Sequence, residues 1–236
     1  MKILLTRPQR DSEKLALKLE KSKHTVEIAP LIRIIKTNSK ENININVNDF
    51  SAIVFTSKNG IRYLGNSSFR EKLIFTVGDG TYIEAKKSGY KNINNADGDV
   101  FNLISAINKN YFKINTDILH ITSSQPNKHF INAFKNTNIN YEILPVYEIR
   151  IIDDFKTKIE NFLIQNSGVL TFFSPRTADS FFNIVKKMKL NEHCSKQIIV
   201  GLSKQIIKRL ESLKFKKTYI AKKPNEESLL SIINNL

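Results

Sequence analysis

Short apolar runs alternate with longer amphipathic stretches along the whole chain. Six times an apolar run ends in a small or polar turn that leads into a helical pattern, at Thr6, Thr56, Val77, Ile121, Phe173 and Val200. In the first helical stretch Leu15 and Leu19 recur at helical spacing, and Asp11 or Ser12 can cap its start. Continuous apolar strands separated by helices indicate a parallel sheet covered on both faces. The pattern therefore predicts an α/β fold.

This pattern occurs twice. Residues 2–34 align without a gap with residues 117–149, and Pro30 and Pro145 close the two copies 115 residues apart. Residues 51–107 align more loosely with residues 168–236. That alignment matches Gly78 with Gly201 and requires an insertion around residues 188–194. A repeat of this length predicts two similar lobes, each a parallel sheet flanked by helices, and excludes a solenoid.

The chain is expected to cross between the lobes twice. The segments LIRII (31–35) and VYEIRII (146–152) each follow a repeat proline, and we expect them to pair as a two-stranded hinge. This pairing gives lobe 1 as residues 1–34 plus 152–236 and lobe 2 as residues 37–147, with hinge crossings near 30–36 and 145–151. Equal halves cut at mid-chain are the alternative. Pockets favour the interface of such lobes, so we expect a cleft between them.

Composition narrows the class of protein. The single cysteine, Cys194, excludes an intramolecular disulfide framework and a thiolate zinc site. Lys2 is followed by only three apolar residues, too few for a signal sequence, and no stretch reaches membrane length. We therefore expect a cytoplasmic protein without a membrane contact. His24, His120, His129 and His193 lack metal-ligand spacing and are expected to be surface or strand residues, so neither a metal nor a cofactor is expected.

The chain is strongly basic. It has 37 Lys and Arg residues against 22 Asp and Glu, a formal net charge of +15, which favours capture of polyanions. The alternative is a compositional bias towards Lys, Asn and Ile that leaves many lysines as solvated surface. The cations are spread along the chain without a zinc or RNA-binding motif, which argues against a nucleic-acid partner. A nucleic-acid binder would show strongly salt-dependent binding.

Catalytic signatures with a fixed spacing are missing. The segment VGDGT is not a dinucleotide fingerprint, because Ile83 stands where the third glycine would be, and no P-loop occurs. In an open parallel sheet, ligands bind beyond the carboxyl ends of the strands. The turns expected there contain these candidate ligand-binding residues: Arg7, Thr56, Ser57, Gly78, Thr81, Thr122, Ser123, Ser174, Arg176, Gly201 and Ser203.

Hydroxyls and free N–H groups at helix N-termini suit carboxylates or phosphates. Each Ser or Thr can instead be a helix N-cap and nothing more. The sequence alone leaves both interpretations open for every single turn. A cofactor-free site for an anion is the prediction that the whole set supports.

The order and spacing of several segments resemble the uroporphyrinogen-III synthase family over nearly the whole chain. These segments are ILLTRP, HTVEIAPLI, IVFTSKNGIRYL, FTVGDGT, PVYEI, LTFFSPRTADSF, IIVGLSK and KPNEESLLSII. The resemblance implies two lobes with an interrupted first domain. It also implies a hydro-lyase of porphyrin and heme biosynthesis that closes the linear tetrapyrrole hydroxymethylbilane to uroporphyrinogen III, with loss of water and inversion of ring D. Such a substrate carries eight carboxylates, in agreement with the basic chain.

The resemblance also assigns roles. Tyr147 matches the tyrosine proposed to help the ring A hydroxyl to leave, with hinge packing as the alternative. Ser57, Thr81 and Ser174 fall on positions that face the family's cleft, and Arg7 and Arg176 are expected carboxylate partners by charge and placement. One departure is GLSK at 201–204, where the family has G-P-T-T. Ser203 keeps a hydroxyl there, but Lys204 replaces a threonine.

Partners follow from the same resemblance. We expect a monomer that binds one small polyanionic substrate and makes at most a transient contact with the preceding enzyme of the pathway. A noncatalytic two-lobed binding module or sensor for a small polyanion is the alternative. Fold alone does not choose between the two.

Overall fold

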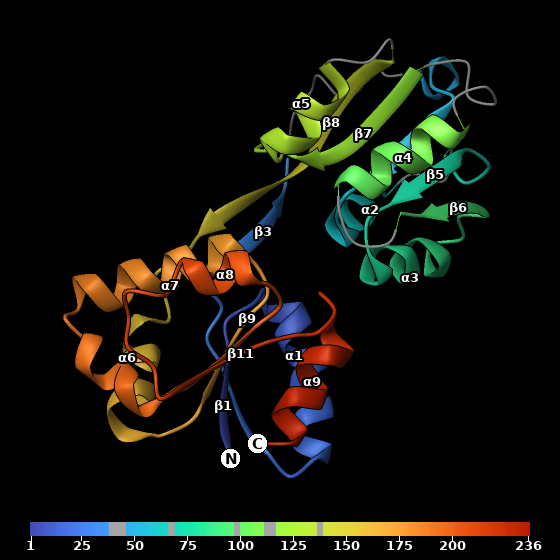
Figure 1. The fold of residues 1–236 in the computed structure, drawn as a ribbon. Coiled ribbons are helices and arrows are strands. Elements are labelled where there is room, and N and C mark those ends of the chain that lie inside the picture. The colour runs from blue at the N-terminus through green and yellow to red at the C-terminus, as the bar shows by residue number, and fades with distance from the viewer. Residues whose placement is uncertain (38–45, 66–68, 97–99, 111–116, 136–138) are drawn as a thin grey trace. The chain divides into compact units, whose positions relative to one another are not determined.

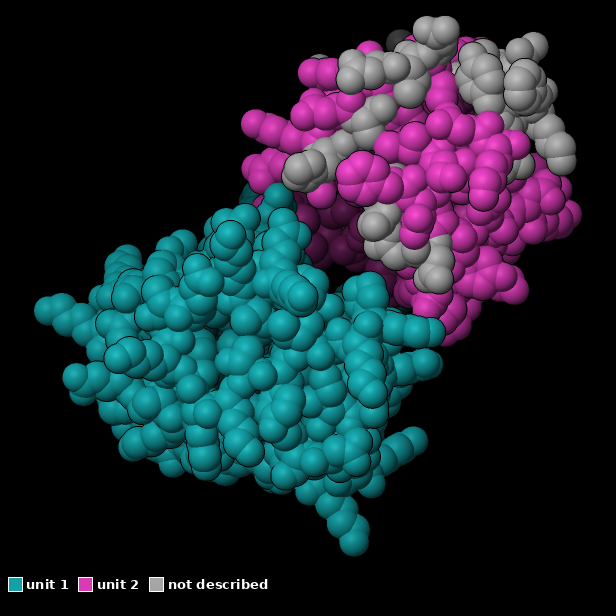
Figure 2. All heavy atoms as spheres, in the orientation of Figure 1, with its two compact units in different colours: residues 1–33, 150–236 teal, residues 34–149 magenta. Residues whose placement is uncertain are grey.

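The computed structural model describes residues 1–37, 46–65, 69–96, 100–110, 117–135 and 139–236. The chain divides into two compact units, coloured separately in Figure 2. Unit 1 comprises residues 1–33 and 150–236, and unit 2 comprises residues 34–149. The assignment of each unit as an independent lobe, with the bounds expected from the sequence, stays a prediction.

Unit 1 is built on a five-stranded sheet with the order β11-β10-β9-β1-β2. Figure 1 shows the ribbon of this unit with β1, β9 and β11 labelled. Its elements are β1 (Lys2–Leu5), α1 (Gln9–Lys21), β2 (Thr25–Ile28), α6 (Lys156–Gln165), β9 (Val169–Phe172), α7 (Pro175–Lys187), η4 (Asn191–Lys196), β10 (Ile198–Gly201), α8 (Lys204–Lys208), β11 (Lys217–Ile220) and α9 (Glu226–Asn234). All its strand pairs are parallel. Phe162, Phe181 and Ile206 bring α6, α7 and α8 onto one core, and Leu15 and Leu229 bring α1 and α9 onto another.

Unit 2 contains most of a six-stranded sheet with the order β3-β8-β7-β4-β5-β6. The elements of this sheet and its helices are β3 (Ile32–Lys36), η2 (Val47–Asp49), β4 (Ala52–Phe55), α2 (Lys58–Leu64), β5 (Leu73–Thr76), α3 (Asp79–Lys87), β6 (Asn92–Asn95), α4 (Val100–Asn110), β7 (Asp117–Ser123), α5 (Lys128–Lys135) and β8 (Asn140–Ile151). Ile61 of α2 and Ala85 of α3 lie in one core, whereas Leu103 of α4 and Phe134 of α5 lie in another. Helices therefore cover both faces of each sheet, and the predicted α/β fold is confirmed.

Strands β3 and β8 carry the chain between the units. They are neighbours in the sheet, and the Thr37 N–H donates to the Val146 carbonyl at 3.1 Å while the Ile152 N–H donates to the Leu31 carbonyl at 3.1 Å. The residue numbers of the bonded partners increase along one strand while they decrease along the other, so this pair is antiparallel. The predicted pairing of the two crossing segments is confirmed.

The two sheets repeat each other strand for strand. Ile3 pairs with Val26 between β1 and β2, and Ile118 pairs with Tyr141 between β7 and β8, so the offset of 115 residues is preserved in the register. Strands β9, β10 and β11 correspond in the same way to β4, β5 and β6.

One part of the predicted alignment is wrong. The strand register places Gly201 opposite Phe172 and Thr76 opposite Phe55, so Gly201 corresponds to Thr76, and Gly78 corresponds to Ser203. Ser203 stands 29 residues after Ser174, whereas Gly78 stands 21 after Ser57. The sequence alignment matched the two glycines because they are the same residue type. The insertion that includes η4 is longer than this match allows.

Among the described residues, no helix has the length and hydrophobicity to span a bilayer.

Candidate functional site

The candidate residues of unit 1 follow β1, β9 and β10 and therefore lie at the carboxyl edge of its sheet. Ser174 caps α7, since its Oγ accepts from the Thr177 N–H at 3.2 Å and lies 2.7 Å from Thr177 Oγ1. Ser203 caps α8 by accepting from the Ile206 N–H at 3.4 Å. Both serines thus satisfy helix N–H groups that would otherwise lack a partner. Capping leaves the Ser203 hydroxyl hydrogen able to donate to a further acceptor, whereas the Ser174 hydroxyl already shares a hydrogen bond with Thr177 Oγ1.

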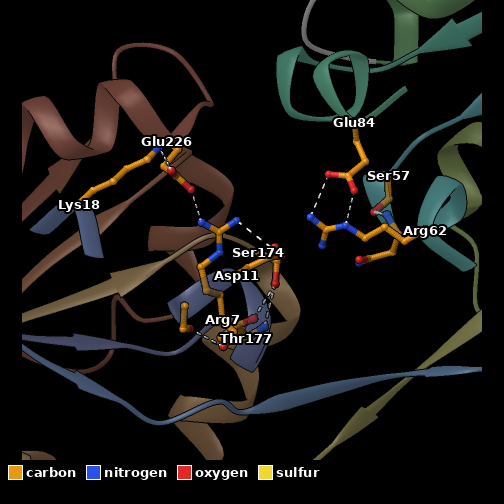
Figure 3. A network of polar contacts seen from close by, with 11 residues as sticks. Arg7, Asp11, Lys18, Ser57, Arg62, Glu84, Ser174, Thr177 and Glu226 are labelled. Carbon is orange, nitrogen blue, oxygen red and sulfur yellow. Dashed lines mark hydrogen bonds and ion pairs between the residues drawn. The ribbon is translucent and has the colours of Figure 1, made fainter. Parts of the chain in front are cut away.

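Arg7 is held by carboxylates of its own unit (Figure 3). Its Nη1 lies 2.7 Å from Glu226 Oε2, its Nη2 lies 3.8 Å from Asp11 Oδ2, and its guanidinium stacks 4.0 Å from the ring centroid of Phe173. The side chain is only 11% exposed. An incoming carboxylate would have to compete with these partners, so the geometry assigns Arg7 a role in holding α9 beside the β1 turn. Its contact with substrate stays a prediction.

Glu226 is the centre of this cluster. Lys18 Nζ donates to its Oε1 at 2.7 Å, in addition to the bond from Arg7. Burial raises the pKa of Glu226, but the hydrogen bonds and charges of Lys18 and Arg7 outweigh burial, and the net pKa lies below its ordinary value. The carboxylate is therefore ionised at neutral pH, which keeps the cluster paired.

Arg176 differs from Arg7. It lies in the first turn of α7, and its Nη1 is buried without a hydrogen-bond partner among the described residues. Such a donor retains the capacity to bind an oxygen, because buried N–H groups normally find an acceptor. At Gly201 an added Cβ would lie 2.8 Å from Ile207 Cδ1, the end of a flexible side chain. Lys204, the first residue of α8, is exposed.

In unit 2, two candidate residues begin helices at the carboxyl edge of the sheet. Ser57 caps α2 by accepting from the Asn59 N–H at 3.2 Å. Gly78 precedes α3 with a φ of 76°, a left-handed value that glycine adopts without a steric penalty. Thr81 is buried in the first turn of α3. Arg62 and Glu84 tie α2 to α3 with bonds of 2.9 and 3.0 Å (Figure 3).

The predicted turn at Thr122 and Ser123 is a strand. Both residues belong to β7 and are buried, each 4% exposed. β7 continues past the predicted end because β8 pairs with it as far as Tyr147, across a register shift between Thr122 and Ser123. A role for these two hydroxyls at the sheet edge stays a prediction, and the chain leaves the strand only at Ser124.

Thr56 hydrogen-bonds the buried His120. Its Oγ1 lies 3.0 Å from His120 Nε2, and the Tyr141 hydroxyl bonds His120 Nδ1 on the other side of the ring. Burial lowers the pKa of His120 to about 3, so the imidazole is neutral at physiological pH. The signal that could have revealed it is the repeat, since His120 stands in an apolar strand where the first copy has Leu5.

Tyr147 lies in β8 and is 4% exposed. Its ring stacks on Tyr63 with centroids 6.0 Å apart and an interplanar angle of 29°. Its carbonyl accepts from the Ser124 N–H at 2.8 Å, which ties β8 to the end of β7. The side chain therefore packs as the alternative of hinge packing predicts, and its role as a proton donor stays a prediction. Within the described ranges, no group of three or more His, Cys, Asp or Glu side chains is placed to hold a metal.

The geometry gives hydroxyl and N–H donors at the carboxyl edge of both sheets, and similarity to known proteins shows the family of the chain. The family model described as "Uroporphyrinogen-III synthase HemD" matches residues 13–231. The chain belongs to the uroporphyrinogen-III synthase family. Two relatives have names from the same family. A "Putative uroporphyrinogen-III synthase" of Methanocaldococcus jannaschii is 25% identical over 254 residues, covering 100% of this chain and 99% of the relative.

The second relative is longer. The "Porphyrin biosynthesis protein HemD" of Ruminiclostridium josui is 24% identical over 205 residues, which are 80% of this chain but only 40% of that protein. Two solved structures share the fold. The uroporphyrinogen-III synthetase of Helicobacter pylori has a TM-score of 0.68 at 15% identity, covering 98% and 97% of the two chains. A mutant uroporphyrinogen III synthase of Thermus thermophilus has a TM-score of 0.64 at 12% identity, covering 100% and 98%.

Proposed function

We propose that this protein is a cofactor-free hydro-lyase that closes hydroxymethylbilane to uroporphyrinogen III, and that it acts as a cytoplasmic monomer. The family match over residues 13–231 carries the proposal. The donors at the carboxyl edges of the two sheets and the net charge of +15 support it, because the substrate carries eight carboxylates. The net charge alone would suit any polyanion, so the family is the deciding observation.

Binding is proposed to depend on neutral donors more than on paired cations. The helix N-termini capped by Ser57, Ser174 and Ser203 present N–H groups whose dipoles favour carboxylates. Arg176 adds a guanidinium nitrogen that has no partner among the described residues. We expect these groups to bind different carboxylates of one substrate molecule.

The chemistry that must be controlled is a choice between two ring closures. The C–O bond to the ring A hydroxyl breaks, water leaves, and the resulting azafulvene is attacked by ring D. Attack through the substituted carbon of ring D gives a spiro intermediate, whose fragmentation and reclosure produce the type III isomer, whereas direct closure gives type I. Holding ring D in the first geometry is a proximity and orientation effect, worth about 7 to 11 kcal/mol in well-organised sites.

The test supplies freshly made hydroxymethylbilane and resolves the products by isomer. We expect type III in large excess over the type I product that forms spontaneously. An unchanged type I product would reject the proposed activity. Binding of the bilane without any change in the isomer ratio would favour the alternative of a noncatalytic binding module.

Tyr147 is the residue we propose to assist the leaving hydroxyl. A phenol with an ordinary pKa of about 10 stays protonated at neutral pH and can donate to the departing oxygen. We expect Tyr147→Phe to lower kcat about 100-fold, the lower range for a general acid. Because the ring still packs on Tyr63, the melting temperature and the KM should change little. A variant with normal kcat would show that Tyr147 serves packing alone.

A further inference from the structure

Unit 2 contains a chain of three hydrogen-bonded polar side chains, in which His120 is fully buried and Tyr141 and Thr56 on either side of it are partly buried. Tyr141 of β8 bonds His120 of β7, and His120 lies 3.0 Å from Thr56, the residue that follows β4. Phe130 and Phe134 pack against His120 and Tyr141, respectively, so this chain lies in an apolar environment. Thr56 is only partly buried and directly precedes the cap Ser57.

The hydrogens in this chain can be ordered. A neutral imidazole carries one N–H and one lone pair. Among the described residues the Tyr141 hydroxyl has no other partner, and burial raises the pKa of this phenol, so it keeps its proton and donates it to His120 Nδ1. The N–H of His120 is then on Nε2 and donates to Thr56 Oγ1. Because its oxygen already accepts this bond, the Thr56 hydroxyl is left to donate its own hydrogen elsewhere.

Unit 1 shows that the fold does not require these polar groups. The strand registers place Leu5, Val26 and Phe173 where unit 2 has His120, Tyr141 and Thr56. All three of these residues belong to or pack against one apolar cluster of unit 1. Burying polar atoms costs free energy unless they are hydrogen-bonded. A purely structural solution is therefore apolar, and the polar version in unit 2 needs another explanation.

We propose that His120 and Tyr141 are positioning residues that orient the Thr56 hydroxyl, so that its hydrogen is free to donate to an anionic oxygen beyond the end of β4. A hydroxyl held in this way suits an acceptor such as a carboxylate. The inference rests on the proposed function for the identity of the ligand, a carboxylate of the bilane. The order of the hydrogens does not depend on that function.

The first test measures the tautomer of His120 directly from the ¹⁵N chemical shifts of its two ring nitrogens in the full-length protein. We expect the Nε2–H form in the wild type and a shift towards a mixed population in Tyr141→Phe. Tyr90→Phe is the matched control, because it deletes a phenol oxygen from the core of the same unit without a contact to His120, and it should leave the tautomer unchanged. A wild-type Nδ1–H form or an imidazolium would overturn the proposal.

The second test measures KM for hydroxymethylbilane. We expect Thr56→Val to raise KM about tenfold, the effect of one hydrogen bond to a charged group. Tyr141→Phe should raise KM about threefold in the wild type and have no effect in the Thr56→Val background, because it acts only through Thr56. His120→Gln should keep KM near the wild-type value, since its amide can donate to Thr56 and accept from Tyr141.

The outcomes separate the positioning role of His120 and Tyr141 from the proposed function. Additive effects of Thr56→Val and Tyr141→Phe on KM would overturn the positioning role, even if the tautomer is as expected. A rise of KM in His120→Gln equal to that in His120→Leu would do the same. If the wild type makes no type III isomer, the proposed function fails. The tautomer measurement then still decides whether His120 donates to Thr56 and leaves the Thr56 hydroxyl hydrogen free to donate.

Discussion

Units 1 and 2 repeat one arrangement of parallel strands but make opposite choices at the same three positions. Unit 1 fills them with Leu5, Val26 and Phe173 and is apolar there. Unit 2 fills them with the polar trio of Thr56, His120 and Tyr141. Because the strand register is shared, the difference lies in the side chains and not in the backbone. The comparison separates what this fold requires from what one copy has added to it.

Unit 1 has polar residues of its own, but they are satisfied differently. Thr6 Oγ1 donates to the Thr171 carbonyl at 2.7 Å, and Thr171 Oγ1 donates to the Leu4 carbonyl at 3.3 Å. Unit 2 has Ile121 and Val54 at the matching positions. A hydroxyl that donates to a backbone carbonyl needs no second side chain. Each threonine can therefore be replaced without depriving another side chain of its hydrogen-bond partner. The trio of unit 2 lacks this independence, since three side chains depend on one another.

The largest expected effect tests a second difference between the units. Helix α2 of unit 2 has Gly60 where helix α7 of unit 1 has Thr177, as counted from the caps Ser57 and Ser174. A Cβ at Gly60 would lie 2.8 Å from the Ile121 carbonyl oxygen, which is backbone and cannot move aside alone. We expect Gly60→Ala to lower the free energy of unfolding by about 3 kcal/mol, the cost of overpacking a core. Urea denaturation measures it.

Gly80→Ala is the matched control, because α3 offers this glycine open space with no atom within 4 Å of an added Cβ. Alanine there should leave stability unchanged or raise it by up to about 1 kcal/mol through helix propensity. Equal destabilisation by both substitutions would mean that the close approach of α2 to β7 is not what Gly60 provides.

The next effect concerns the polar trio itself. His120→Leu copies the residue of unit 1 but leaves the Thr56 and Tyr141 hydroxyls without their partner, at a cost of about 2 kcal/mol. The triple variant Thr56→Val, His120→Leu, Tyr141→Phe removes all the polar atoms together and should recover most of that loss. A triple variant as unstable as the single one would show that the trio stabilises unit 2 and contradict the comparison with unit 1.

The same variants predict a pH dependence. The pKa of His120 is lowered by burial to about 3 in the folded protein, from 6.5, so the unfolded chain binds more protons between these values. Its contribution to stability is therefore complete above pH 6.5 and is lost as the pH falls towards 3. The wild type should lose more stability than the triple variant between about pH 6.5 and 4. Parallel pH profiles would show that His120 is not buried as a neutral group.

Much of this arrangement was predictable because strand patterns are strong signals. The run before Thr56 is apolar throughout and the run before Phe173 is apolar except for Thr171, as is typical of central parallel strands. The edge strands β6 and β11, with the sequences NINN and KTYI, were not predicted because they are too polar to stand out. Helix α6 was not predicted either, and the segment of unit 2 that corresponds to it lies mostly outside the described residues.

The candidate site was predictable only as a set of positions. Turns after apolar strands could be located, but the sequence could not show that Arg7 is already paired with Glu226. That ion pair joins residues more than 200 positions apart. The His120 contacts were missed for a related reason: a single histidine in an apolar strand carries no motif, and only its comparison with Leu5 makes it unusual.

The smallest expected effect separates capping from binding at the serines that both units share. Ser57→Ala and Ser174→Ala each remove an N-cap and should lower the free energy of unfolding by about 1 kcal/mol. Glycine is nearly as good a cap as serine, so Ser57→Gly and Ser174→Gly should cost only about 0.3 kcal/mol.

If the serine hydroxyls also donate to substrate carboxylates, the glycine variants will regain stability relative to the alanine variants but not the wild-type KM for hydroxymethylbilane. Restoration of both by glycine would assign these serines to capping alone, and it would do so separately for each unit. A defect in KM confined to Ser57→Gly would place the substrate-specific donors in unit 2, beside the Thr56 hydroxyl, and leave the matching turn of unit 1 as scaffold.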